Sequence, residues 1–349
     1  MSLALRCESL RLRIGEFELR SVSLELGSGG YLVLLGPSGC GKTTLLKTLC
    51  GIQRPDEGVV EVDGEEVTDL APNVRNIGYV PQDATLFPHM KVRDNISFGL
   101  RYLHTDEQDR RDRFDRAVQL MRVSQFLDRS CEGLSGGEAK RVSLARSLVL
   151  SPSVILLDEP LGMLDPISRE ELVSALRDIR RETGTATVHV THDREEAWAL
   201  GRTCAVMNDG AIEQAGTLQQ VFREPATEFV ARFTGASNII PVECERVNGE
   251  LVGRSAFGIL RMNGPECSDR AAIRPEWLQV SQGDGAISAI LASVRDRGAF
   301  VELEVDAGSE RLVAHVPPQQ ARGLTVGGNL LMRMEGRAFG LPSEEVADA

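Results

Sequence analysis

The sequence predicts two parts: an α/β domain built on a mostly parallel sheet, and a smaller all-β, barrel-like domain after it. The chain has 349 residues, enough for two or three domains of ordinary size. Up to residue 235, short apolar runs alternate with longer charged segments of helical pattern, as in βαβ units. Beyond it, short alternating runs dominate, glycine recurs, and Trp277 is the only tryptophan or tyrosine. We therefore expect domains at residues 1–235 and 236–349.

The composition excludes several classes of protein. Hydrophobic residues make up 42% of the chain and charged residues 26%, which is ordinary globular usage. The net charge of −12 is spread along the chain, so most of its surface would repel a phosphate backbone and no nucleic-acid partner is expected. The longest apolar runs fall far short of the ~20 residues that a membrane-spanning helix needs. The apolar start, Met1–Leu5, is interrupted by Arg6 and Glu8, unlike a signal peptide.

The cysteines bear on the cellular compartment. There are seven, an odd number, and none are arranged as C-x-x-C. This pattern favours reduced thiols in a cytosolic protein and argues against a zinc site. Together with the composition, it predicts a soluble cytosolic protein of more than one domain.

Three apolar runs in the first part have the character of buried parallel strands. They are Tyr31–Leu35, Val154–Leu157 and Thr187–Val190, and each is followed at once by polar residues. In open α/β sheets, ligands bind at the carboxyl ends of the strands. The residues that follow these runs are therefore the first candidates for a functional site.

The first run leads into a glycine-rich loop of the pattern G-x-x-x-x-G-K-[ST], followed by a helical pattern over Leu45–Cys50. Successive backbone N–H groups of such a loop, with the positive end of the helix, cradle phosphates. Lys42 is placed to reach the β- and γ-phosphates and Thr43 to coordinate Mg²⁺. An ordinary turn before a helix is the alternative, and the flanking strand and helix weigh against it. The predicted nucleotide-binding residues are Gly36, Pro37, Ser38, Gly39, Cys40, Gly41, Lys42, Thr43 and Thr44.

The second and third runs end in groups that suit hydrolysis. Asp158, at the end of a buried strand beside a phosphate loop, is placed to hold Mg²⁺ through water. The adjacent Glu159 is placed to polarise an attacking water, although the pair could instead only cap the next helix. His192 follows the third run, whose strand would lie beside the other two, and is therefore expected within reach of a γ-phosphate.

A second phosphate nest is predicted at Leu134–Glu138, before a helix expected over Ala139–Leu150. Ser135, Gly136 and Gly137 offer backbone N–H groups at a helix start. Ser135 with Glu138 three residues later is also a capping box, and both interpretations hold together. Because one loop already binds the phosphates, this nest needs another nucleotide or another subunit.

Taken in order, these motifs resemble the nucleotide-binding subunits of ABC transporters, specifically importers with a C-terminal extension. The resemblance covers residues 3 to about 235. The matching segments are Gly36–Thr44 as the Walker A motif, Gln82 within Tyr79–Asp83 as the Q-loop, Leu134–Glu138 as the signature, Val154–Glu159 as the Walker B motif with the catalytic glutamate, Leu164-Asp165 as the D-loop, and His192 as the switch histidine.

The resemblance implies specific roles. The catalytic residues would be Glu159, His192 and Gln82; the magnesium ligands would be Thr43, Gln82 and Asp158; and Asp165 and the signature residues would join the nucleotide site. ATP and Mg²⁺ are then the cofactors, and residues 83–150 form a helical subdomain. Two copies would pair head to tail, so that the Ser135 loop of one closes over the ATP held by the other.

Two positions depart from the family pattern. An aromatic residue that usually stacks on adenine is replaced by Arg13 and Ile14, and nearby Phe17 alternates with Leu19 as core residues do. Gly162 stands where the D-loop commonly has serine, which removes a hydroxyl and adds backbone freedom.

Residues 236–349 resemble the oligomer-binding-like β-domain appended to importer ATPases, through Asn238–Ile240 and Ala272–Glu276. Such domains are regulatory or dimerising, and both alternatives stay open. Arg274 and Arg295 are candidate partners for an anion. The expected strands are Val242–Val247, Ala286–Val294, Val301–Val305 and Leu312–Val316.

The predicted function is ATP hydrolysis that drives import of a small solute through separate membrane permease subunits. The protein would sit peripherally on the cytoplasmic face of the membrane, with a periplasmic or extracellular solute-binding protein as an indirect partner. The compact N-terminus, Gly15–Leu24, resembles the molybdate/tungstate type; sulfate, ferric-iron, polyamine and sugar importers are the alternatives. A soluble ABC ATPase outside transport is less favoured, because there is one cassette and no heptad run.

The stretch Leu86–Met90 is apolar in a charged region, and Val92 and Ile96 follow it. It suits a groove for a short helix of the permease. The alternative is that these residues form the helical subdomain's own core.

Overall fold

The computed structural model describes residues 2–264, 267–281 and 287–341. The chain divides into two compact units, Met1–Leu218 and Gln219–Ala349. Helix α8 (Glu228–Thr234) and most of α7 (Leu218–Arg223), which precede the expected boundary at residue 235, fall in the second unit. Over the described part of the chain, no helix is both long and apolar enough to span a membrane.

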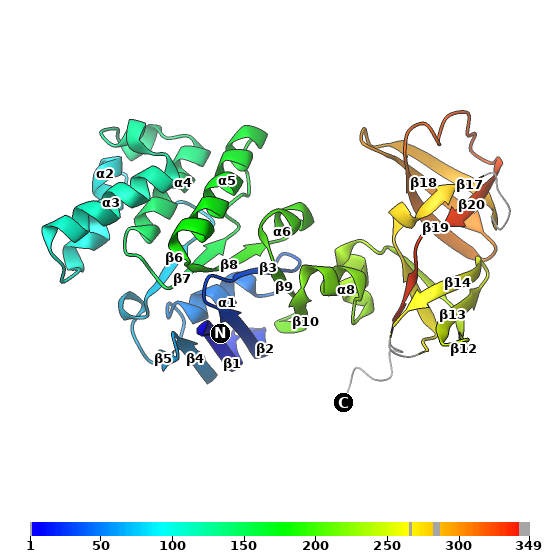
Figure 1. The fold of residues 1–349 in the computed structure, drawn as a ribbon, viewed down its shortest axis with the longest axis horizontal. Coiled ribbons are helices and arrows are strands. Elements are labelled where there is room, and N and C mark those ends of the chain that lie inside the picture. Colours follow the sequence, from blue (N-terminus) through cyan, green and yellow to red (C-terminus); the bar gives the residue numbers. More distant parts are fainter. Residues whose placement is uncertain (1, 265–266, 282–286, 342–349) are drawn as a thin grey trace. The chain divides into compact units, whose positions relative to one another are not determined.

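The larger sheet of the first unit carries the three predicted strands. Among the described residues it has six strands in the order β10-β9-β3-β8-β7-β6, all parallel except β10 (Figure 1). Its strands are β3 (Tyr31–Leu35), β6 (Ile77–Val80), β7 (Val154–Asp158), β8 (Ala186–Thr191), β9 (Thr203–Asn208) and β10 (Ala211–Thr217). Strands β3, β7 and β8 are buried throughout, and β8 lies between the other two. The predicted neighbourhood of the three strands is confirmed, so their carboxyl ends meet at one edge.

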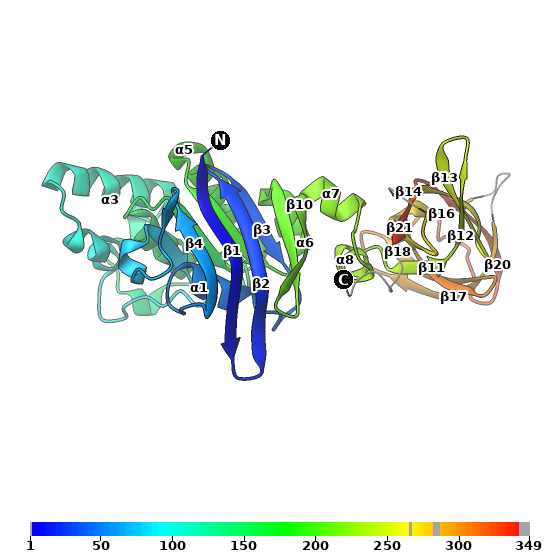
Figure 2. The ribbon, with the colours of Figure 1, turned by 90° about the horizontal axis from the view of Figure 1, so that it is seen from below.

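A second, antiparallel sheet covers one side of this core. Its order is β2-β1-β4-β5, and Figure 2 shows β1, β2 and β4 running side by side. The strands are β1 (Leu3–Ile14), β2 (Phe17–Gly27), β4 (Glu57–Val62) and β5 (Glu65–Glu66). One apolar cluster joins both sheets to helix α1 (Lys42–Leu49), with Leu10, Leu34 and Leu45 fully buried in it. Burying each such leucine stabilises the fold by about 2 kcal/mol, so α1 is held firmly behind the loop that precedes it.

A helical region lies between β6 and β7. It contains α2 (Val92–Ser97), α3 (Glu107–Met121) and α4 (Gly136–Leu148), with 3₁₀ turns at Phe98–Tyr102, Ser124–Phe126 and Cys131–Gly133 (Figure 1). The remaining helical elements of the first unit are the 3₁₀ turn Pro72–Val74, α5 (Pro166–Thr183) and α6 (Arg194–Leu200). Helix α4 begins three residues before the predicted start, because the Ser135 cap initiates it there.

The structure corrects the predicted apolar groove at the start of this region. Val92 and Ile96 are fully buried and belong to the helical region's own core. Phe87 is half-buried, and its ring packs against Phe98 at 4.7 Å between centroids. Only Leu86–Met90 keeps part of its apolar surface exposed.

The second unit is a barrel-like domain of two sheets, as predicted. In its described residues, one sheet has the order β11-β15-β21-β14-β13-β12 and the other β16-β20-β17-β18-β19. The strands of the first are β11 (Asn238–Pro241), β12 (Glu243–Val247), β13 (Glu250–Ser255), β14 (Gly258–Asn263), β15 (Arg270–Ile273) and β21 (Ala338–Leu341). The strands of the second are β16 (Leu278–Val280), β17 (Ile287–Asp296), β18 (Val301–Ala307), β19 (Glu310–Val316) and β20 (Asn329–Met334). A 3₁₀ turn covers Pro275–Trp277, and one apolar cluster draws side chains from both sheets.

All four strands predicted in this unit need adjustment at their ends. Strand β18 extends beyond Val305 to Ala307, and β19 begins at Glu310 rather than Leu312. The run Val242–Val247 begins at Glu243, because the Val242 backbone N–H donates to Asp269 at 2.8 Å and not to β13. The run Ala286–Val294 corresponds to β17, and Ala286 lies outside the described residues.

The prediction that all cysteines are reduced is wrong for one pair. Cys244 on β12 and Cys267, before β15, form a disulfide with their Cα atoms 5.3 Å apart. The two are separated by 23 residues, and only the folded sheet brings them together, so their spacing gave no signal. The other cysteines, all within the described residues, are free thiols: Cys7, Cys40, Cys50, Cys131 and Cys204.

Candidate functional site

A cavity of about 300 Å³ opens at the carboxyl edge of the parallel sheet, where the sequence predicts the nucleotide site. The chain reaches this edge through the loop that joins β3 to α1. The residues that line the cavity are Phe17, Ser38, Gly39, Gly41, Lys42, Thr43, Thr44, Gln82 and Glu159.

Two glycines of the loop have no room for a side chain. A Cβ on Gly36 would lie 2.3 Å from the carbonyl oxygen of Met207. Gly41, the N-cap of α1, has φ +106°, and a Cβ there would lie 2.3 Å from the Phe17 ring. At these two positions the loop passes so close to its neighbours that only glycine fits. The loop residues that follow line the cavity, where the backbone N–H groups of a glycine-rich loop suit a phosphate.

Lys42 begins helix α1 and is 5% exposed. Its ammonium donates hydrogen bonds to the carbonyl oxygens of Gly36 at 2.9 Å and Pro37 at 2.7 Å. The third donor has only the Cys40 sulfur, at 3.8 Å, and sulfur is a weak acceptor that a phosphate oxygen in the cavity would replace. The lysine thus combines a fixed position with a charge suited to a phosphate.

Thr43 and Asp158 come together at the base of the site. The Thr43 hydroxyl donates to the Asp158 carboxylate at 3.0 Å, and the Tyr79 hydroxyl donates to the other carboxylate oxygen at 3.2 Å. Burial raises the pKa of Asp158, and the nearby charge of Glu159 adds to this, while the two hydroxyl hydrogen bonds oppose it. A hydroxyl and a carboxylate oxygen side by side are the hard ligands that Mg²⁺ prefers.

Glu159 and His192 form the second pair, one residue beyond the ends of β7 and β8. Glu159 has φ +44°, and its backbone N–H donates to Val190 of β8 at 3.0 Å. Its carboxylate lies 3.3 Å from Nδ1 of His192, whose side chain is 59% exposed. A carboxylate that lines the cavity is thus held against an imidazole that water can reach.

Gln82 lies in the loop after β6 and lines the cavity with its exposed side chain. Its backbone carbonyl accepts a hydrogen bond from the buried Lys140 of α4. Gln82 therefore stands between the nucleotide cavity and the helical region.

The predicted signature residues form the expected cap at the start of α4 but do not line this cavity. Ser135 and Glu138 form the reciprocal capping box at the start of α4, with bonds of 3.3 and 2.7 Å. Ser135 and Gly136 are exposed, Gly137 is buried, and none of the three is among the described residues that line the cavity. Asp165 is also exposed and is not among the described residues that line the cavity. Its carboxylate caps α5 by accepting from the backbone N–H groups of Ile167 and Ser168.

Sequence reasoning missed two residues of the site. Phe17 is only half-buried: it packs partly on the core and also lines the cavity, whereas Leu19 is fully buried. The alternation of Phe17 with Leu19 is typical of core residues and does not show that Phe17 begins β2, opposite Gly41. Tyr79 belongs to the predicted Q-loop segment, but its bond to Asp158 depends on β6 lying next to β7.

The two arginines proposed as anion partners in the second unit have other partners. The Arg274 guanidinium donates to the backbone carbonyls of Thr234, at 2.8 Å, and Phe222. Arg295 pairs with Glu302 at 3.4 Å and Glu304 at 3.2 Å, so an anion there would meet two carboxylates. Neither arrangement supports an anion site.

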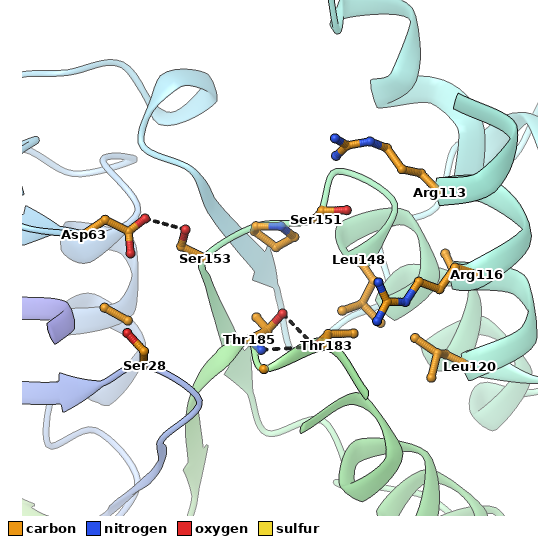
Figure 3. Close-up of a pocket in the computed structure, with 14 residues that line it drawn as sticks. Ser28, Asp63, Arg113, Arg116, Leu120, Leu148, Ser151, Ser153, Thr183 and Thr185 are labelled. Atoms are coloured by element: carbon orange, nitrogen blue, oxygen red, sulfur yellow. Dashed lines mark hydrogen bonds between the residues drawn. The ribbon is translucent and has the colours of Figure 1, made fainter. Parts of the chain in front are cut away.

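A second cavity of about 330 Å³ lies at the opposite edge of the sheet, beside the amino ends of β7 and β8 (Figure 3). Its polar groups largely bond to one another or to the backbone. Ser153 donates to Asp63, Thr183 donates to Thr185 at 2.8 Å, and Arg116 donates to a backbone carbonyl of α5. This arrangement ties α3 and the strand ends together and offers no reactive group.

Comparisons with other proteins agree with this site. The family model described as ABC transporter matches residues 19–162. A spermidine/putrescine import ATP-binding protein from Thermobifida fusca is 40% identical over 80% of this chain and 74% of its own length. A molybdate/tungstate import ATP-binding protein from Pyrococcus horikoshii is 36% identical over 89% of this chain and 91% of its own.

Solved structures share the fold of the first unit. A dimeric ATP-binding cassette in a post-hydrolysis state, bound to ADP and phosphate, superposes with a TM-score of 0.55 at 28% identity. The match covers 61% of this chain and 98% of that one. With a phosphate loop, a buried Thr–Asp pair and a Glu–His pair at one sheet edge, the chain belongs to the ABC transporter family, as an ATP-hydrolysing subunit of an importer.

Proposed function

We propose that this chain binds ATP with Mg²⁺ in a head-to-tail homodimer and hydrolyses it to drive a small solute through separate membrane permease subunits. The observation that supports this most directly is the meeting of the phosphate loop, the Thr43–Asp158 pair and the Glu159–His192 pair at one edge of the sheet. Each pair belongs to a different step of phosphoryl transfer to water.

The first step is binding. The loop Gly36–Thr44 presents its N–H groups and the third donor of Lys42 to the ATP phosphates. The Phe17 ring stands beside Gly41, as a wall that the base or ribose contacts. Thr43, Asp158 and Gln82 would hold Mg²⁺, whose charge offsets that of the phosphates.

The second step is attack on the γ-phosphorus. A water oxygen bonds to this atom as the bond to the bridging oxygen of ADP breaks, and the water's proton passes to the Glu159 carboxylate. His192 holds that carboxylate through Nδ1, and with both ring nitrogens protonated its exposed ring can also donate from Nε2 to a γ-phosphate oxygen. The products are ADP and phosphate.

The dimer would supply the residues that the cavity lacks. Ser135, Gly136 and Asp165 are exposed on the first unit, away from the described lining of the chain's own cavity. The first backbone N–H groups of α4, at the positive end of the helix, suit the phosphates held by a second copy. That a solved relative is a dimer with ADP and phosphate supports the same arrangement.

For the solute, we propose an oxyanion such as molybdate or tungstate. The resemblance of the compact N-terminus and the Pyrococcus horikoshii relative support it. Relatives of similar identity are import ATP-binding proteins for spermidine/putrescine, sn-glycerol-3-phosphate, sulfate/thiosulfate and Fe(3+) ions, so these solutes remain the alternatives. The subunit would act peripherally at the cytoplasmic face of the membrane, with a solute-binding protein delivering the solute to the permease.

The domains would divide this work. Residues 1–235 would form the ATPase cassette, with residues 83–150 as the helical subdomain that meets the permease. The half-exposed Leu86–Met90 supports this docking role. Residues 236–349 would serve regulation or dimerisation.

The test of hydrolysis is Glu159→Gln. The amide keeps the size of the side chain but cannot take a proton, so we expect turnover to fall by at least about 100-fold, with ATP binding retained. Phosphate release and binding of a fluorescent ATP analogue measure the two effects. The variant should also form an ATP-dependent dimer on gel filtration, and hydrolysis near the unaltered rate would refute the role of Glu159.

A further inference from the structure

Side chains of helix α4 bind the backbone carbonyl groups of the segment that contains Gln82. Lys140 donates to the carbonyl oxygens of Pro81, at 3.2 Å, and Gln82. Further along the helix, Arg146 donates to the carbonyl oxygen of Thr85 at 3.1 Å and Ser147 to that of Tyr79 at 3.4 Å. Polar side chains of one helix thus fix the chain from the end of β6 to the far side of Gln82.

Lys140 is the contact at Gln82 itself, and it is 6% exposed. Burying an ammonium is unfavourable unless polar partners replace its water. Here two carbonyl oxygens do so, and the carboxylates of Asp83, Asp158 and Glu159 act on the same charge. Burial lowers the pKa of Lys140, and these three carboxylates oppose the change. An apolar side chain would fill this space without that cost, but it could not hold the Gln82 carbonyl.

Lys140 lies near the start of α4, close to the signature residues. Ser135 caps the helix, and Lys140 follows less than two turns later. Because so short a stretch of hydrogen-bonded helix separates them, a displacement of Ser135–Gly137 would be passed to Lys140 and, through its hydrogen bonds, to the Gln82 backbone.

We propose that Lys140 is a positioning residue that links the signature segment of α4 to Gln82 in the chain's own nucleotide site. This inference rests on the proposed function, in which the signature segment binds the ATP of a second copy. Closure on that ATP then sets the position of Gln82 beside the first ATP. The two sites of the dimer communicate through the first turns of one helix, and hydrolysis depends cooperatively on ATP.

The experiment is steady-state hydrolysis by full-length Lys140→Met. Methionine fills the volume but donates no hydrogen bond. We expect kcat to fall by about tenfold, with the KM for ATP within about twofold, since Lys140 does not line the cavity. We expect the Hill coefficient to fall from about 2 to about 1. Lys140→Arg, which keeps charge and donors, should restore part of both.

The matched control is Lys91→Met in the same helical region. The Lys91 side chain is exposed and makes no hydrogen bond or ion pair within residues 2–264, 267–281 and 287–341, so kcat and cooperativity should not change. A Lys140→Met protein with unaltered kcat and Hill coefficient would overturn the link, while Glu159→Gln separately tests the function. Absence of hydrolysis in the unaltered chain and in Lys91→Met alike would overturn the proposed function, and this inference with it.

A second measurement separates positioning from a general structural role. In the Glu159→Gln background, Lys140→Met should still give the ATP-dependent dimer, because Ser135–Gly137 and the phosphate loop are unchanged. Loss of the dimer would mean that Lys140 maintains the signature helix itself, which contradicts a specific link to Gln82.

Discussion

Single side chains at the sheet edge divide between those that we propose to hold phosphates and those that we propose to hold the attacking water. Lys42 and Thr43 lie on α1 and are fixed by the core behind it. Glu159 and His192 lie just past strand ends, where the backbone bond from Glu159 to Val190 locks their relative position. Because Gly162 lies close to Glu159, a serine Cβ there would meet the Glu159 backbone oxygen at 3.4 Å, an ordinary contact. Lack of space therefore does not explain the glycine at this D-loop position, and its backbone is not in the left-handed region.

Phe17→Leu tests the cavity wall at the residue scale. The ring stands against Gly41, and leucine covers less of a bound nucleotide, so we expect the KM for ATP to rise by roughly fivefold with kcat little changed. Steady-state kinetics measure this, with Phe114→Leu on α3 as the control. An unchanged KM would show that Phe17 serves the core alone.

At the scale of elements, helix α4 carries three functions on one short segment. Its N-terminus presents the signature residues, its next turn holds Gln82, and its last turns hold Thr85 and Tyr79. The capping box is what starts the helix at Gly136, and such a cap contributes about 1 kcal/mol. The geometry of the signature nest thus depends on the cap.

Glu138→Gln tests the charge in this cap. The backbone hydrogen bond from Ser135 is the main cause that lowers the Glu138 pKa below its ordinary value, and the charge of Arg129 adds to it. The ionised carboxylate therefore stabilises the folded state above the unfolded pKa, about 4.3, and this stability is lost as the pH falls through the lower folded pKa.

Urea unfolding at pH 7 and pH 3 measures the effect. We expect Glu138→Gln to be destabilising at pH 7 and its difference from the unaltered chain to shrink at pH 3. Exposed Glu107→Gln at the start of α3 is the control. A loss of stability in Glu138→Gln that is equal at both pH values would contradict a contribution from the charge.

The whole molecule joins a catalytic unit to one that contributes no predicted catalytic group. Every candidate catalytic and metal-binding residue lies at or before His192, within the first compact unit. The second unit has its own apolar core and a disulfide, so its fold does not depend on the nucleotide site. A second contact between copies would keep them near each other while the cassettes open, which raises the effective concentration for closure.

Deletion of the second unit, residues 219–349, tests this division. We expect ATP hydrolysis to persist and the dimer to dissociate at higher protein concentration than in the full chain, measured by analytical ultracentrifugation. A truncated form that dissociates at the same protein concentration as the full chain would contradict this second contact.

The sequence by itself determined the strands β3, β7 and β8, the phosphate loop and the capping box at Ser135. These are local patterns: a buried strand is a run of apolar residues, and a loop or cap is set by residues a few positions apart. Strand adjacency also followed, because parallel strands that each end in polar groups share one edge.

Only the tertiary structure decided which side chains meet across long separations. Lys140 and Gln82 are 58 residues apart, and Tyr79 and Asp158 are 79 apart. The Cys244–Cys267 disulfide and the contact of Phe17 with Gly41 also join residues that are far apart in the sequence. Such contacts depend on how helices and strands pack, which no local pattern records, so the buried lysine, the disulfide and the cavity wall were visible only in the folded chain.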